Sequence, residues 1–146
     1  MAVTLNPYVN LVDGRARAAL EFYRSVLGGE LEVMTFGEMG TEGPLAEQVM
    51  HGQLSSDRLT LMVSDTPPEM AEVTIGNNVS ISLSGGVEDE DWLRAAFDGL
   101  AQDGTVTVPL SRAPWGDTYG ALVDQFGVSW MVDFGNGGAA SGAADA

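Results

Sequence analysis

The chain has 146 residues, and no apolar run in it is long enough to span a bilayer. It has no cysteine, which excludes disulfides, thiolate nucleophiles and Cys-ligated metal sites, and no basic-then-apolar stretch at the N-terminus, so we expect a cytoplasmic protein. Six basic residues, all arginine, stand against 21 acidic ones, for a formal net charge of -15. Such a surface repels phosphate backbones, so we expect neither a nucleic-acid nor a membrane partner.

The first half of the chain predicts one strand, one helix and three further strands. Leu20, Tyr23 and Leu27 recur at helical spacing, and Gly28 follows them as a residue that can end a helix in the left-handed conformation. The strands are predicted from alternating side chains. After a leader over residues 1–6, the expected elements are strand 7–12, helix 15–27 and strands 30–37, 47–55 and 59–65.

The second half repeats this order. Leu93 and Leu100 follow Leu20 and Leu27 at the same separation of 73 residues. Pro67-Pro68 lies in the expected linker between the halves, and residues 135–146, rich in Gly, Ala and Ser, are expected to be a disordered tail. The expected elements are strand 78–84, a helix that begins in the acidic residues 88–91, and strands 105–110, 117–124 and 128–134.

Such a duplication predicts an α+β fold made of two similar modules, at about residues 7–65 and 78–134. One module of this length cannot bury its apolar face alone, so we expect a single domain over residues 7–134. Two similar halves also suggest one shared cleft, which is where function is expected.

Several segments resemble a known superfamily. They are Ala19–Tyr23, Leu27–Gly29, Met34–Met39, Val49–His51, Ser64–Pro68, Pro114–Gly116 and Asp124–Trp130. With the repeated strand-helix-strand-strand-strand order, they resemble the vicinal oxygen chelate superfamily of glyoxalases, extradiol dioxygenases and bleomycin-binding proteins, and within it the PhnB-like group. The resemblance spans about residues 6–134 and implies two βαβββ repeats that form a glyoxalase-like half-barrel cleft.

Alternation along four strands assigns a mixed polar set of side chains to the face turned away from the helices. The resemblance implies that this face is the wall of the binding cavity. We expect ligand contacts there from the strands and from the Pro-Trp-Gly loop. The candidate ligand-binding residues are Asn10, Gln53, Met62, Ser80, Trp115, Tyr119 and Met131.

Metal-dependent members of the superfamily carry His or Glu ligands on the first and last strands of each module. Carried over by register, those positions are Tyr8, Met62, Ser80 and Met131. None of these side chains suits a hard or borderline divalent cation. We therefore expect no metal site and no cofactor.

His51 is the only histidine and shares a strand face with Gln53. It is either a general base or ligand-orienting donor in the cavity, because imidazole titrates near neutrality, or a hydrogen-bonded structural histidine. Both interpretations stay open. With Tyr8 and Asp133 it makes up the candidate catalytic set.

Two functions follow as expectations. The first is a binding protein for a small molecule, of the bleomycin-resistance type, that sequesters a ligand which the acidic charge and Trp115 suggest is cationic and planar. The alternative is a metal-independent enzyme of lyase or isomerase type that moves a proton with His51, Tyr8 or Asp133. A homodimer is also expected, because Met34, Phe36, Met39 and Trp92 leave apolar surface unassigned.

Overall fold

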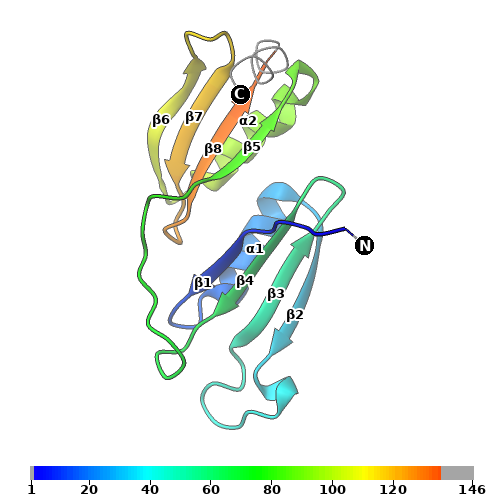
Figure 1. The fold of residues 1–146 in the computed structure, drawn as a ribbon, viewed down its shortest axis with the longest axis vertical. Helices are drawn as coiled ribbons and strands as arrows, with labels where there is room; N and C mark the ends of the chain where they lie inside the picture. The colour runs from blue at the N-terminus through cyan, green and yellow to red at the C-terminus, as the bar shows by residue number, and fades with distance from the viewer. Residues whose placement is uncertain (1, 136–146) are drawn as a thin grey trace. The chain divides into compact units, whose positions relative to one another are not determined.

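The computed structural model describes residues 2–135, which divide into two compact units between Thr74 and Ile75. Each unit contains one four-stranded sheet and one α-helix that lies against one face of that sheet (Figure 1). Among the described residues, no helix is both long enough and apolar enough to cross a membrane. The predicted α+β class and the two βαβββ repeats are confirmed.

In the first unit the strand order is β1-β4-β3-β2. β1 runs parallel to β4, and the other neighbours are antiparallel. The elements are β1 (Tyr8–Leu11), α1 (Ala16–Leu27), β2 (Glu30–Thr35), the 3-10 helix η1 (Gly37–Met39), β3 (Val49–Ser55) and β4 (Thr60–Asp65).

The second unit has the same topology, with strand order β5-β8-β7-β6 and a parallel β5-β8 pair. The elements are β5 (Ile81–Gly85), the 3-10 helix η2 (Val87–Asp89), α2 (Glu90–Leu100), β6 (Thr105–Arg112), β7 (Thr118–Val123) and β8 (Ser129–Phe134). β5 therefore begins three residues later than predicted, so Ser80 precedes the strand. β6 continues two residues further, to Arg112.

Each helix forms a core with its own sheet. The buried stripe of α1 includes the predicted Leu20, Tyr23 and Leu27. This helix contacts β3 and β4, where Leu54 and Val63 are buried. The corresponding stripe of α2 consists of Leu93, Ala96, Phe97 and Leu100, and the sheet side of that core contains Trp130, Val132 and Phe134. Burial of a large apolar side chain contributes roughly 1.5–3 kcal/mol, so these stripes account for the position of the helices.

The helices cover only one face of each sheet. We call the other side of each sheet its open face. Along β8, for example, its residues alternate with the buried Trp130, Val132 and Phe134. Tyr8, His51, Gln53 and Met62 lie on the open face of the first unit, and Ser82, Tyr119, Met131 and Asp133 on that of the second.

Two expectations have different outcomes. The apolar segment Met34/Phe36/Met39 is only partly exposed, because Phe36 is buried while Met34 and Met39 are exposed. The prediction of Phe36 as surface was wrong, because the residue turns into the core where β2 ends and η1 begins. Apart from Gly135, the expected tail lies outside the described residues. The single domain with a shared cleft stays a prediction.

Candidate functional site

Tyr8 and His51 meet on the open face of the first unit. The hydroxyl of Tyr8 lies 3.1 Å from Nδ1 of His51, and the two ring centroids are 5.6 Å apart. The sheet register makes this contact, because Tyr8 on β1 stands opposite Met62 on β4, and Met62 stands opposite Gln53 on β3. Two predicted residues that are 43 positions apart are thus brought together.

This hydrogen bond orients the imidazole and leaves Nε2 without a hydrogen-bond partner among residues 2–135. In either tautomer one ring nitrogen can donate or accept toward a ligand. Tyr8 is 45% exposed and His51 is half-buried, so both remain accessible. The pair can therefore bind a polar group or transfer a proton.

Two other predicted ligand contacts are already engaged within the unit. Asn10 Oδ1 accepts a hydrogen bond of 3.2 Å from the hydroxyl of Thr66, and Gln53 Nε2 donates one of 2.9 Å to Ser55 Oγ. Each amide keeps a second polar atom for a ligand. Asn10 lies two residues after Tyr8 on β1, and Gln53 lies two residues after His51 on β3.

Asp65 is a buried acid that holds two of the elements around this site. It is 3% exposed, and its two carboxylate oxygens accept hydrogen bonds from the backbone N–H of Ala16 (2.9 Å) and of Val49 (2.8 Å). One acid thus fixes the first residue of α1 and the start of β3, two residues before His51. The sequence reasoning missed this role, although an acid at the end of an apolar strand was a visible signal.

The second unit brings Asp133, Tyr119 and Trp115 together. Asp133 on β8 stands opposite Tyr119 on β7, and the ring of Trp115 lies 6.1 Å from that of Tyr119. Trp115 is 49% exposed in the loop before β7. These three predicted residues therefore form one cluster on or beside the open face. Met131 lies on the neighbouring position, opposite Ala121.

Ser80 does not take the position that was carried over to it. Because β5 begins at Ile81, it is Ser82 that pairs with Met131, as Tyr8 pairs with Met62 in the first unit. The sequence alignment of the halves was two residues out of register here, since nothing in the alternation of Ser80, Ser82 and Ser84 distinguishes them.

The carboxyl group of Asp133 has a pKa raised to about 6 from the ordinary value of 3.8. Burial is the largest cause, followed by a hydrogen bond with the side chain of Asp117 and by repulsion from its charge. A hydrogen bond from Trp115 acts in the opposite direction and lowers the pKa. Asp133 therefore titrates in the range where an acid–base group is useful.

The metal that the superfamily resemblance implies does not fit these side chains. The equivalent positions hold Tyr8 with Met62 and Ser82 with Met131, a set of hydroxyls and thioethers. Within the described part of the chain, no three His, Asp or Glu side chains gather as a possible ligand cluster. We derive no chemical step through a metal.

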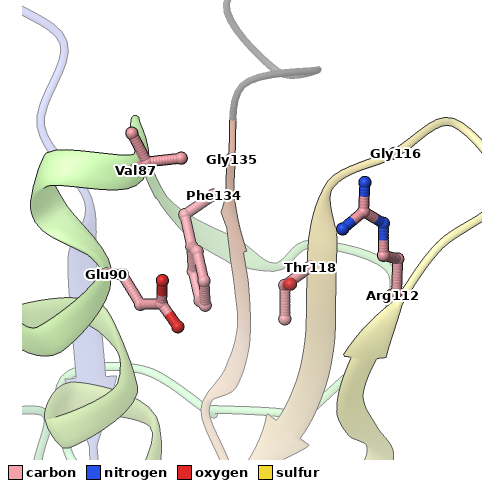
Figure 2. A pocket seen from close by; sticks show the side chains of 7 residues that line it. All are labelled: Val87, Glu90, Arg112, Gly116, Thr118, Phe134 and Gly135. Carbon is pink, nitrogen blue, oxygen red and sulfur yellow. The ribbon is translucent and has the colours of Figure 1, made fainter.

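A cavity of about 230 Å³ lies on the helix side of the second sheet (Figure 2). Its lining includes Phe134 on β8 and its neighbour Thr118 on β7, together with residues from η2, α2 and β6. Glu90 in the lining pairs with Arg94 at 2.7 Å, and Arg94 in turn stacks on Phe134. None of the predicted site residues lines this cavity.

Comparisons with known proteins agree with the fold. Residues 5–132 match the family model of the Glyoxalase/Bleomycin resistance protein/Dioxygenase superfamily. Protein YjdN of Escherichia coli (strain K12) is 26% identical in an alignment 142 residues long that covers 88% of this chain and 93% of that protein.

Two solved structures extend this likeness. Protein PA1353 from Pseudomonas aeruginosa superposes with a TM-score of 0.75 at 30% identity, over 92% of this chain and 98% of that one. A PhnB protein from Bacillus cereus, described as a putative 3-demethylubiquinone-9 3-methyltransferase, superposes with a TM-score of 0.68 at 22% identity, over 90% and 99% of the two chains. The latter likeness concerns the fold.

Proposed function

Because the chain belongs to the Glyoxalase/Bleomycin resistance protein/Dioxygenase superfamily, we propose that it binds a small organic molecule on the open face of one of its units without a metal ion, as a sequestering protein. The accessible Tyr8–His51 pair carries this proposal. Its hydroxyl and imidazole suit the polar groups of an organic ligand, and the adjoining Met62 supplies a soft apolar contact that adapts to varied shapes.

Titration of the metal-free protein with bleomycin, followed by amide NMR shifts, tests this function. We expect saturable shifts at Tyr8, His51 and Met62. Tyr8→Phe removes one hydroxyl and should weaken binding roughly 2- to 10-fold, the effect of one hydrogen bond. The matched variant Tyr119→Phe makes the same change on the open face of the second unit and tells which face binds.

Binding that survives chelation and is weakened by one of these variants supports the proposal. Linear, unsaturated shifts with bleomycin and with a set of neutral aromatic fragments would oppose it. A requirement for one divalent ion per chain would oppose its metal-free part.

A second candidate function is proton transfer by a metal-independent enzyme, and the raised pKa of Asp133 favours it. A carboxyl group that titrates near pH 6 can accept a proton from a carbon acid and return it. The test is hydrogen–deuterium exchange at the methyl group of pyruvate, measured by NMR. Catalysed exchange should be lost in Asp133→Asn or in His51→Ala while pyruvate binding remains. If the unaltered protein does not raise the exchange rate above that of pyruvate in buffer alone, an enzyme of this kind is contradicted.

A further inference from the structure

We propose that Asp117 and Asp133 form a carboxyl pair that shares one proton, in which the buried Asp117 is a positioning residue and Asp133 offers a protonated carboxyl group to ligands with a carbonyl or carboxylate oxygen. The inference rests on the proposed binding function and deepens it by naming a ligand class. That class differs from the cationic ligand which the net charge suggests.

The sheet register places the two acids on the same side of β7 and β8. Thr118 stands opposite Phe134 and Tyr119 opposite Asp133, so Asp117, one residue before Thr118, lies beside Gly135. A Cβ atom at Gly135 would lie 3.0 Å from Oδ1 of Asp117, and Gly135 has a φ of +143°. The glycine thus leaves the space that the Asp117 carboxyl group occupies.

Asp117 is poorly solvated. It is 2% exposed, and its Oδ1 atom is buried without a hydrogen-bond partner in the described part of the chain. An ionised carboxylate in such surroundings is costly unless it is paired. The sheet register places another acid, Asp133, on the neighbouring strand and on the same face, and Asp117 contributes to the raised pKa of Asp133. Two carboxyl groups in contact cannot both be ionised at low cost, so one proton between them satisfies both.

The groups around Asp133 do not stabilise its ionised form enough to remove this proton. Trp115 donates a hydrogen bond to Asp133, which favours the charged form but is outweighed by burial and by Asp117. Its neighbours across the sheet are Tyr119 on β7 and Ser84 on β5, neither of which carries a positive charge. Arg112 stands opposite Thr118, and Thr118 lines the cavity on the helix side of the sheet. The strand position of Arg112 therefore belongs to the helix side, whereas Asp133 lies on the open face.

The protonation state of Asp133 determines which ligands this face prefers. While protonated, Asp133 donates a hydrogen bond to an oxygen acceptor. Once ionised, it repels a carboxylate and attracts a cation. Binding of a carboxylate ligand should therefore weaken as the pH rises through about 6, and binding of a cation should strengthen over the same range.

The direct test is a carboxyl ¹³C NMR titration of the full chain between about pH 3 and 8. The Asp133 resonance, assigned with Asp133→Asn, should titrate near pH 6. Asp117→Asn should lower that midpoint by about one unit or more, because it removes the like charge. The matched variant Asp98→Asn makes the same charge change on the exposed side of α2 and should leave the midpoint unchanged.

The ligand class is tested with pyruvate, which is a carboxylate throughout this range. Its affinity for the unaltered protein should fall by up to about tenfold between about pH 5 and 7, because the protonated fraction of Asp133 falls by that factor, and in Asp133→Asn it should be independent of pH. An Asp133 midpoint near 4 in the unaltered protein overturns the pair even if bleomycin or other molecules bind. Pyruvate binding that rises with pH, or none at pH 5 while the Asp133 midpoint is near 6, overturns the ligand class alone.

Discussion

Single buried acids hold the ends of elements in this protein. Asp124, which is 3% exposed, accepts hydrogen bonds from the backbone N–H of Phe126 (2.8 Å) and of Val128 (3.1 Å) and from Trp130 Nε1 (2.9 Å). It closes the turn between β7 and β8 and anchors a core tryptophan. Asp65 has a related role in the first unit.

We predict that Asp124→Ala lowers the free energy of unfolding of the second unit by about 3 kcal/mol, because it leaves several donors without their acceptor. Urea unfolding followed by tryptophan fluorescence measures this loss. The control is Asp103→Asn, an exposed change in the same unit that should alter the free energy by less than about 0.5 kcal/mol. Equal stabilities of the two variants would contradict the role of Asp124.

Asp133 gives a second prediction at this scale, on pH and stability. Its folded pKa of about 6 exceeds the ordinary 3.8, so the folded state holds the proton more tightly and the contribution of Asp133 to stability falls as the pH rises from about 4 to about 6. Asp133→Asn stays neutral throughout. Its stability relative to the unaltered protein should therefore increase over this window, as measured by thermal unfolding. A relative stability that is constant, or that decreases, contradicts the raised pKa.

The elements of each unit pack through close contact between one helix and the middle of its sheet. Gly52 on β3 marks this contact in the first unit, since an added Cβ atom would meet Cδ1 of Leu20 and would lie 2.9 Å from the backbone oxygen of Val63. Gly120 on β7 has the same relation to Phe97 of α2, at 2.9 Å. The glycines let the helices approach.

We predict that Gly52→Ala destabilises the first unit by about 1–3 kcal/mol, because the added methyl group forces α1 away from β3. Chemical unfolding monitored by circular dichroism measures the loss. Gly76→Ala is the matched control, since its Cβ would meet only a flexible Asn78 oxygen at 3.8 Å. A Gly52→Ala protein as stable as this control would show that α1 does not need the close approach.

At the scale of the whole molecule, charge and exposed apolar surface set the behaviour in solution. The formal net charge of -15 favours solubility but opposes compaction through self-repulsion. We predict that raising NaCl from about 10 to about 150 mM increases the midpoint of urea unfolding, because the Debye length falls to about 8 Å. A midpoint that is unchanged or lower would show that favourable charge pairs outweigh the repulsion.

We also predict a homodimer, and the exposed Met34 and Met39 are its candidate contacts. Light scattering at micromolar concentration should give twice the chain mass of 15.3 kDa. Met34→Glu should reduce it to the mass of one chain. The control Met70→Glu alters an exposed methionine in the segment after β4 and should leave the dimer intact. A single-chain mass for the unaltered protein contradicts the prediction.

The order of elements, the α+β class and most of the core were determined by the sequence alone, because periodicity records which side of a helix or strand is buried. Leu20, Tyr23 and Leu27 were assigned to one stripe of the helix in this way, and all three are buried. The choice of Tyr8, His51 and Asp133 also followed from alternation and residue chemistry.

Tertiary structure decided what alternation cannot encode, namely register across strands and the partners of buried polar groups. Ser82 rather than Ser80 stands opposite Met131 because strand pairing, not the serine pattern, sets where β5 begins. Tyr8 reaches His51 only because β4 lies between β1 and β3. Asp117 was missed because its burial beside Gly135, and hence its effect on Asp133, depends on two strands meeting at one edge.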